Sequence, residues 1–317
     1  MFVGIDMGGT VVRMGLVDND GEILCRANVP TAGVRDKFGL LDNVLSLCRR
    51  FEEVAESHNG RIDGVGFGIP GVVDNVAGVA RYNLKIPAFC DIEVRKYIHE
   101  HFRADVNCQL ANNAGAAALA EAVAGAARGT RFSVTMTIGA GLGAGVVVDG
   151  RLYTGCNAAG IEIGHMCIVS EGELCDCGRQ GCFEAYVSVP ALVRRIRDAA
   201  EKNPESLLGK IAAKNGRVRV EARTVFDAAR QECPVAKSVI DDYARWLAEG
   251  IGNIIVCYQP EVVCIGGAIS SQGDYLLNAV RDHLQKKILF PNFQRTRLVI
   301  AQLGDDAGII GAAMLCR

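Results

Sequence analysis

Residues 2–24 read FVGIDMGGTVVRMGLVDNDGEIL, and the same pattern returns at residues 133–153, which read SVTMTIGAGLGAGVVVDGRLY. Each stretch is an apolar run, a glycine-rich turn, a second apolar run, a turn containing Asp-Gly, and a third apolar run. Asp-Gly between apolar runs is a strong hairpin signal, so each stretch predicts three consecutive strands. The repetition predicts a chain built from two domains on one plan.

Helical patterns follow each copy, which makes each half a predicted α/β domain. The four expected helices lie at about 38–57, 92–103, 188–201 and 235–257. We place an N-terminal domain at 1–127, completed by a C-terminal helix at about 301–317, and a larger C-terminal domain at 128–300.

Two further segments of the first half each combine a predicted strand with a turn or helix start rich in Gly, Pro or Asn. GVGFGIPGVVD at 64–74 predicts a buried strand that enters a Gly/Pro turn. VNCQLANNAGAAALAEAVAGAA at 106–127 predicts a strand that ends at Asn112-Asn113 and an alanine-rich helix that follows it. Asparagine is a good N-cap, so the simplest role for Asn113 is to cap that helix.

The composition is that of a globular protein and excludes some classes of partner. Of the 317 residues 50% are hydrophobic, and 34 basic against 36 acidic residues give a net charge of −2. A nucleic-acid or membrane-surface binder needs a concentrated basic face, which this balance does not suggest. The first residues, MFVGIDMGGT, lack the pattern of a signal peptide, and no apolar run is long enough to span a bilayer. We therefore expect a cytoplasmic protein.

A cluster of metal-binding residue types lies in the second half. His165 is followed by three cysteines, Cys175, Cys177 and Cys182, separated by glycines that permit tight turns. One imidazole and three thiolates, with no carboxylate, suit a closed tetrahedral zinc site. Because all four positions are filled by protein, we expect the zinc to be structural. The alternative is chance proximity in a chain with 13 cysteines.

Three glycine-rich turns follow apolar runs and could present backbone N–H groups to phosphate oxygens. They contain Asp6, Gly8, Gly9 and Thr10; Gly139 and Gly141; and Gly266 and Gly267. The first adds a carboxylate and a hydroxyl, the groups required near Mg²⁺ and phosphate. None of the three turns has the Walker pattern of a P-loop. None of them contains GxGxxG at the start of a helix, which is the pattern of dinucleotide-binding domains, so we do not expect a nicotinamide cofactor.

Together these features resemble the ROK (repressor, open reading frame, kinase) family, and most closely its bacterial glucokinases. The similar segments are Asp6–Thr10, Gly68–Gly71, His165 with CDCGRQGC at 175–182, and GDDAGIIGAA at 304–313. The resemblance implies a duplicated actin-like (ribonuclease H-like) ATPase fold with an interdomain cleft, Mg-ATP as cofactor, zinc as a structural metal, and a dimer or tetramer. Family repressors carry a helix-turn-helix domain before the first loop, so we expect no binding to nucleic acid here.

The resemblance also implies the roles of individual residues. Asp6 and Thr10 would attend Mg²⁺ and phosphate, and Gly266 and Gly267 the adenosine. A hexose, or a hexoside, would be held by Gly71, Asn112, Asn113, Glu162, His165 and Glu184.

The chain departs from the family pattern at the position of the general base. The kinases have Asn-Asp before the alanine-rich helix, whereas this chain has Asn112-Asn113. A carboxamide cannot accept the proton of a sugar hydroxyl, and general-base catalysis typically contributes ~10²–10⁴-fold. Ala140 replaces a usual threonine, and Gly115 a usual polar residue.

Three functions therefore stay open at the level of sequence. The first is an ATP-dependent hexose kinase, acting on the 6-hydroxyl of a glucose-like sugar and weakened or disabled at Asn113. The second is a sugar-binding protein without turnover. The third is a glycoside hydrolase using Glu162 and Glu184, since that chemistry needs two carboxylates about 5–10 Å apart.

Overall fold

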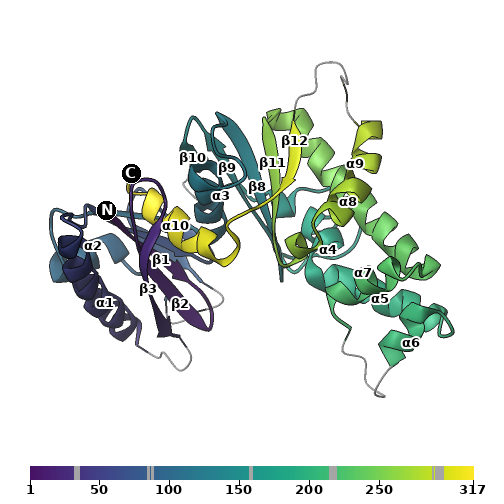
Figure 1. The fold of residues 1–317 in the computed structure, drawn as a ribbon, viewed down its shortest axis with the longest axis horizontal. Helices are drawn as coiled ribbons and strands as arrows, with labels where there is room; N and C mark the ends of the chain where they lie inside the picture. Colours follow the sequence, from purple (N-terminus) through teal and green to yellow (C-terminus); the bar gives the residue numbers. More distant parts are fainter. Residues whose placement is uncertain are drawn as a thin grey trace. The chain divides into compact units, whose positions relative to one another are not determined.

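The computed structural model describes residues 1–31, 36–83, 86, 89–156, 160–213, 220–287, 289 and 296–317. Its two larger sheets each contain five strands (Figure 1). The first has the order β3-β2-β1-β4-β7. Its strands are β1 (Phe2–Met7), β2 (Val11–Val17), β3 (Ile23–Pro30), β4 (Gly64–Ile69) and β7 (Asn107–Asn112). The β1–β2 and β2–β3 pairs are antiparallel, while β1–β4 and β4–β7 are parallel.

The second sheet repeats this order as β10-β9-β8-β11-β12. Its strands are β8 (Phe132–Ile138), β9 (Leu142–Val148), β10 (Arg151–Tyr153), β11 (Val262–Gly267) and β12 (Arg297–Ile300). A short third sheet pairs β5 (Val72–Asp74) with β6 (Val79–Tyr82). Each large sheet thus consists of a three-strand meander followed by two crossover strands, which confirms the duplicated α/β fold predicted from the two copies.

The described helices include all four that the sequence predicted. Those of the first half are α1 (Lys37–Ser57), α2 (Val94–His101) and α3 (Asn113–Ala124). Those that follow β10 are α4 (Phe183–Val187), α5 (Val189–Lys202), α6 (Leu207–Ala213), α7 (Ala222–Arg230), α8 (Pro234–Tyr258), α9 (Asp274–Leu284) and α10 (Ala307–Met314). Four 3-10 turns complete the described elements: η1 (Ile163–His165), η2 (Ala268–Gln272), η3 (Gln285–Lys287) and η4 (Gly304–Asp306).

The chain forms two compact units, and each of them is discontinuous in sequence. The first consists of 1–135, 144–161 and 302–317, and the second of 136–143 and 162–301. The sequence placed the division after residue 127, and as a domain boundary that position stays a prediction. No described helix has the length and apolar character needed to cross a membrane.

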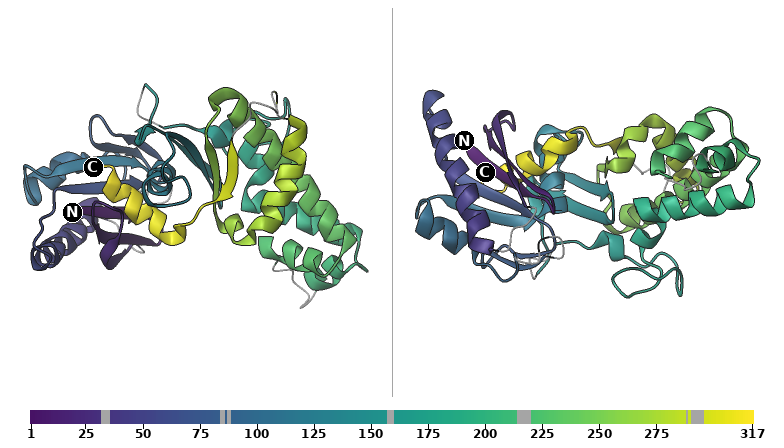
Figure 2. Two further views of the ribbon diagram at one scale, coloured as in Figure 1. Left: turned by 45° about the horizontal axis from the view of Figure 1, so that its top comes forward. Right: turned by 90° about the horizontal axis from the view of Figure 1, so that it is seen from below.

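The C-terminal helix α10 belongs to the core of the first unit. It packs against α3, β1 and β4 (Figures 1 and 2). The contact is so close that a Cβ at Gly66 of β4 would lie 1.7 Å from the carbonyl oxygen of Ala312. Glycine is therefore required where the helix crosses the sheet. This packing explains the apolar, small-residue composition of the tail.

A buried carboxylate fixes the segment that leads into α10. Glu121 of α3 is 1% exposed. Its carboxylate accepts hydrogen bonds from the backbone N–H groups of Ala126 (2.8 Å), Gln302 (2.9 Å) and Leu303 (2.8 Å). A buried carboxylate is tolerated when its oxygens are satisfied in this way. Glu121 therefore connects α3 to the segment that leads into α10.

Candidate metal centre and phosphate loops

The predicted metal ligands converge in the second unit. One ligand atom from each of His165, Cys175, Cys177 and Cys182 lies within 4.8 Å of the other three. Cys175 Sγ is 3.7 Å from His165 Nδ1, and Cys177 Sγ is 3.7 Å from Cys182 Sγ. Sulfur atoms bound about 2.3 Å from a tetrahedral zinc are separated by about 3.8 Å. The spacing and the donor types therefore fit a zinc ion.

Local backbone geometry brings the three cysteines together. The Gly178 N–H donates to Cys175 O, and the Cys175 N–H donates to Arg179 O, both at 2.8 Å. Gly178 and Gly181 have positive φ, which glycine adopts without strain. The turn returns Cys182 to a position beside Cys175 and Cys177, as the CxCGxxGC spacing predicted.

Burial disfavours the charged form of two of these thiols. Desolvation raises the pKa of Cys175, and it raises the pKa of Cys182 to about 12. A hydrogen bond from the backbone of Arg179 lowers the pKa of Cys177. A bound cation would have to displace thiol protons, so metal binding at this cluster is coupled to proton release.

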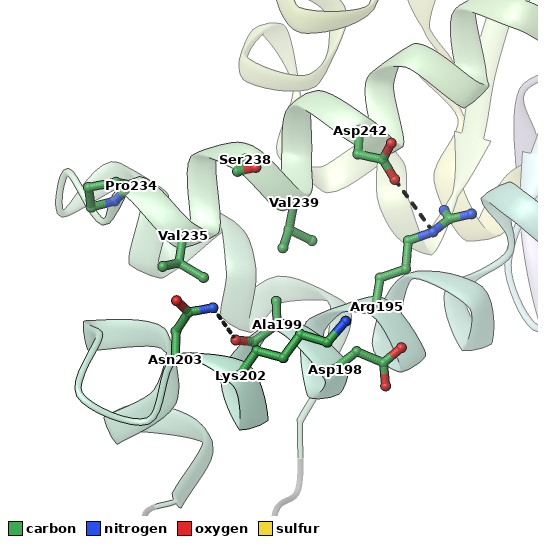
Figure 3. Close-up of a pocket in the computed structure, with 10 residues that line it drawn as sticks. All are labelled: Arg195, Asp198, Ala199, Lys202, Asn203, Pro234, Val235, Ser238, Val239 and Asp242. Atoms are coloured by element: carbon green, nitrogen blue, oxygen red, sulfur yellow. Dashed lines mark hydrogen bonds and ion pairs between the residues drawn. The ribbon is translucent and has the colours of Figure 1, made fainter.

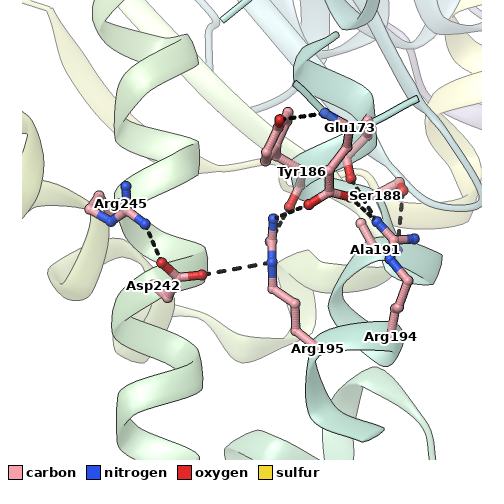
Figure 4. A network of polar contacts seen from close by, with 9 residues as sticks. Glu173, Tyr186, Ser188, Ala191, Arg194, Arg195, Asp242 and Arg245 are labelled. Atoms are coloured by element: carbon pink, nitrogen blue, oxygen red, sulfur yellow. Dashed lines mark hydrogen bonds and ion pairs between the residues drawn. The ribbon is translucent and has the colours of Figure 1, made fainter. Parts of the chain in front are cut away.

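A polar network anchors the ligand loop to the helices (Figure 4). The Glu173 N–H donates to the Tyr186 hydroxyl at 2.8 Å. The Glu173 carboxylate pairs with Arg194 and with Arg195, the latter at 3.5 Å. Arg195 also lies 3.7 Å from a carboxylate oxygen of Asp242 on α8. The loop that carries Cys175 is therefore held from outside by α4, α5 and α8.

Glu184 connects the metal cluster to the second glycine loop. Its Oε2 accepts a hydrogen bond from the Leu142 N–H at 2.6 Å, and its Oε1 lies 3.8 Å from Cys175 Sγ. A Cβ at Gly141 would lie 2.5 Å from Glu184 Oε2, so the carboxylate can reach the loop only because residue 141 is glycine. The loop is also closed internally, since the Gly139 N–H donates to Gly141 O at 2.9 Å.

The third glycine turn lies beside the end of β8. A Cβ at Gly267, which has a φ of +80°, would lie 2.3 Å from the carbonyl oxygen of Ile138. Gly266 and Gly267 therefore neighbour the strand that enters the Gly139 loop. The second unit thus brings together two of the three predicted nucleotide loops. Glu162, in contrast, is exposed one residue before η1, and no described residue pairs with its carboxylate.

The first glycine loop joins β1 to β2 in the first unit. The Gly8 N–H donates to Val11 O at 3.0 Å, while Gly9 and Thr10 are exposed. Asp6 at the end of β1 lies 3.8 Å from the Arg13 guanidinium. An exposed glycine turn beside a carboxylate has the features expected of a loop that binds phosphate and Mg²⁺.

The two asparagines between β7 and α3 have different roles. Asn112 is the N-cap: its Oδ1 accepts from the Ala114 N–H at 2.9 Å, and its Nδ2 donates to Gly71 O at 2.8 Å. The capping role considered for Asn113 was therefore wrong. Asn113 is the first residue of α3 and is half-buried, and the described part of the chain offers its side-chain amide no hydrogen-bond partner. Its amide is left for interactions other than capping.

A groove of the second unit contains none of the predicted site residues (Figure 3). It lies between α5 and the start of α8. Its lining residues are Arg195, Asp198, Ala199, Lys202, Asn203, Pro234, Val235, Ser238, Val239 and Asp242.

Sequence reasoning missed the support of the metal cluster. Glu173, Tyr186 and Arg195 were not predicted, although Glu173 is only two residues from Cys175. Its partners are supplied by helix packing, for which the local sequence has no signal. Cys167 was not predicted either, although it lies only two residues from the predicted ligand His165.

Two sheets of equal strand order, with glycine loops at their hairpins, define a duplicated α/β protein of the actin-like ATPase class. The chain belongs to the ROK family, whose model matches residues 2–317.

Several glucokinases are similar to this protein over almost its whole length. A glucokinase of Thermotoga maritima is 34% identical over 99% of this chain and 96% of its own length. A glucokinase of Streptomyces coelicolor is 33% identical, with 99% and 97% covered. A ROK glucokinase of Streptomyces griseus, solved with glucose and AMPPNP, is 30% identical with a TM-score of 0.76, and 100% and 99% of the two chains are covered. The family and the fold predicted from the sequence are thereby confirmed.

Proposed function

We propose that this protein is a hexose kinase that transfers the γ-phosphate of ATP to the 6-hydroxyl of a glucose-like sugar, and that Asn113 limits its rate. The observation that carries the proposal is the end-to-end similarity to glucokinases, in a chain whose residues 2–317 match the ROK family. Phosphoryl transfer depends mainly on positioning and on electrostatic stabilisation of the phosphates, which exposed glycine loops are suited to provide.

Each group of residues has a distinct task in this proposal. Asp6 and Thr10 hold Mg²⁺ and phosphate, the glycines at 139 and 141 face the phosphates, and Gly266 and Gly267 face the adenosine. The hexose is bound by Gly71, Asn112, Asn113, Glu162, His165 and Glu184. These side chains and backbone groups both donate and accept, which is what a sugar hydroxyl requires.

His165, Cys175, Cys177 and Cys182 would hold one zinc ion. When bound, the ion supplies a rigid cross-link among the four ligands and performs no chemistry on the sugar. His165 uses one ring nitrogen as a ligand and presents the other to the hexose, so the metal fixes the orientation of the imidazole. A metal content near one zinc per chain is expected, and a content far below one would contradict this assignment.

Asn113 stands where a kinase of this family has its base. Its amide can hydrogen-bond the sugar hydroxyl and keep it in place, but it cannot take up the proton as the phosphoryl group is transferred. We expect binding of sugar and nucleotide to persist and the chemical step to be slowed by ~10²–10⁴-fold.

The test is ADP release with Mg-ATP over a panel of hexoses, measured on this chain and on Asn113→Asp. A gain of about two orders of magnitude or more in kcat, with little change in KM, is the expected result. Asn113→Ala is the matched control, because it removes the amide without adding a base.

Silence of both proteins on every hexose would overturn the kinase proposal. Measurable sugar binding would then favour a sugar-binding protein without turnover. Cleavage of a glycoside would instead favour hydrolysis by Glu162 and Glu184.

A further inference from the structure

Cys167 lies directly opposite a predicted zinc ligand. Residues 167 and 182 form an isolated antiparallel β-bridge. The flanking hydrogen bonds run from Ile168 N to Gly181 O and from Phe183 N to Met166 O, both at 2.8 Å. Because those bonds belong to the neighbours and not to the pair itself, Cys167 and Cys182 are a non-hydrogen-bonded pair. Side chains of such a pair project from the same face and come closest together.

This pairing satisfies the backbone requirement for a disulfide. Cα atoms of a non-hydrogen-bonded pair are about 4.5 Å apart, and disulfides span Cα separations of about 4.4–6.8 Å. Cys167 Sγ already lies toward the opposite strand, since a Cβ at Gly181 would be only 3.2 Å from it. A side-chain rotation is therefore sufficient to bring the two sulfur atoms together.

The two thiols differ in access to solvent. Cys167 is exposed, and Cys182 is fully buried at 0%. Within the described part of the chain, the Cys167 thiol has one hydrogen bond, donated to the carbonyl oxygen of Val169 at 3.4 Å. A soluble oxidant would therefore reach Cys167 first, and Cys182 is the cysteine placed opposite it across the bridge.

We propose that Cys167 and Cys182 form a reversible disulfide when the protein meets a peroxide, and that this bond removes Cys182 from the metal-ligand set. It is a site of thiol modification additional to the kinase reaction. It rests on the proposed zinc assignment only for its effect on the metal.

The reaction is balanced with hydrogen peroxide as the oxidant. The Cys167 sulfur attacks one peroxide oxygen, the O–O bond breaks, and a sulfenic acid forms with release of one water. The Cys182 sulfur then attacks the Cys167 sulfur, the S–O bond breaks, and the hydroxyl leaves as a second water. The second water takes its proton from the Cys182 thiol, or from solvent if Cys182 is a thiolate. The two sulfurs lose two electrons, and the peroxide gains them.

The Cys167–Cys182 disulfide would affect more than the number of metal ligands. Cys182 immediately precedes α4, the helix that carries Glu184. The Glu184 carboxylate holds the Leu142 N–H of the second glycine loop. A shift of Cys182 toward Cys167 therefore acts on the start of α4 and, through Glu184, on a loop proposed to face phosphate. Reduced sugar turnover is expected to accompany the disulfide and to return with a reducing agent.

Peptide mapping identifies the bond without reference to activity. Cleavage after arginine and glutamate separates Cys167 (163–171), Cys182 (180–184) and the remaining pair Cys175 and Cys177 (174–179). After treatment with about one equivalent of hydrogen peroxide, we expect 163–171 linked to 180–184, and dithiothreitol should release both. A predominant link between 174–179 and 180–184 would overturn the proposal.

Zinc release provides the second measurement, followed with a chromophoric chelator during the same treatment. We expect Cys167→Ser to release zinc roughly tenfold more slowly than the unaltered chain. Cys257→Ser, which removes another exposed thiol of the second unit, should behave like the unaltered chain. Cys167→Ala should release zinc at the same rate as Cys167→Ser, because both substitutions remove the sulfur atom to which the faster release is attributed. Equal rates of release in all four proteins would overturn the coupling to the metal.

The two proposals fail in distinguishable ways. A reduced protein that contains no zinc would contradict the metal assignment, and the peptide map would still test the Cys167–Cys182 pair. A zinc-loaded protein whose peroxide product lacks the 163–171 link would contradict the disulfide alone.

Discussion

Glu121 gives the most direct test of how the first unit is held together. Its buried carboxylate accepts three backbone N–H groups, two of them from the segment at 302–303 that leads into α10. Each hydrogen bond to a charged group contributes about 1.5–3 kcal/mol, and an unpaired buried donor costs about 1–3 kcal/mol. Glu121→Gln retains one acceptor oxygen and turns an amide NH₂ toward at least one backbone N–H.

We expect Glu121→Gln to lower the free energy of unfolding of the first unit by about 2 kcal/mol, because relief from burying a charge offsets part of the loss. Glu121→Ala leaves all three donors unpaired and should cost about 4 kcal/mol or more. With a urea slope of about 2 kcal/mol/M, the glutamine variant should unfold about 1 M earlier.

The assay uses two probes, since the two units need not unfold together. Circular dichroism reports both units, whereas the fluorescence of the single tryptophan, Trp246 in α8, reports the second. Only the dichroism transition should move, and amide exchange of α10 should accelerate. Glu53→Gln on the exposed face of α1 is the control. An unchanged midpoint in Glu121→Gln would refute the assignment of these hydrogen bonds.

Substitutions in three other parts of the molecule should change stability, zinc release and a tyrosine titration. Gly66→Ala places a methyl group against the Ala312 carbonyl, 1.7 Å from its oxygen, and should destabilise the first unit by about 3 kcal/mol or more, as measured by urea unfolding. Glu173→Gln weakens the pairing with the arginines of α5 and should increase the rate at which a chelator removes zinc, by roughly tenfold. The hydrogen bond to Asp42 raises the pKa of Tyr97 to about 12, so Asp42→Asn should move one tyrosine in an ultraviolet titration back toward about 10.

Substitutions at less constrained positions serve as controls for these variants. Gly252→Ala adds a methyl group that meets only ordinary contacts, the nearest at 3.5 Å, and should be tolerated. Glu171→Gln, in the same loop as Glu173 but exposed, should leave zinc release unchanged. Linkage fixes the direction in which the stability contributed by Tyr97 changes with pH. Because the pKa of Tyr97 is raised in the folded state, this stability is present below the unfolded-state pKa of about 10 and is lost as the pH rises through about 12. A Tyr97→Phe variant that loses no high-pH titration step would contradict the assignment.

The sequence predicted the parts of the fold that are specified locally. The strands around the first two glycine turns follow from apolar runs separated by turn residues, and the helices α1, α5 and α8 follow from their periodicity. The metal ligands were also predictable, because His165 and the CxCGxxGC spacing determine both donor type and proximity.

What the sequence did not predict depends on contacts between distant segments. The cap at the start of α3 belongs to Asn112, whose amide also reaches Gly71 O, two residues beyond the end of the neighbouring strand β4. Similarly, the register that places Cys167 opposite Cys182 comes from how the ligand loop folds back, which no residue spacing specifies. The partners of Glu173 come from helix packing for the same reason.

The discontinuity of the first unit sets an order of events during synthesis. The 140 residues of 162–301 are made before α10, which the sheet of β1 and β4 needs for its cover. At roughly 5–20 residues per second, that sheet waits on the order of ten seconds with its glycine-lined face uncovered on the ribosome. A chaperone that binds nascent chains would find its target on this face, and only until α10 emerges.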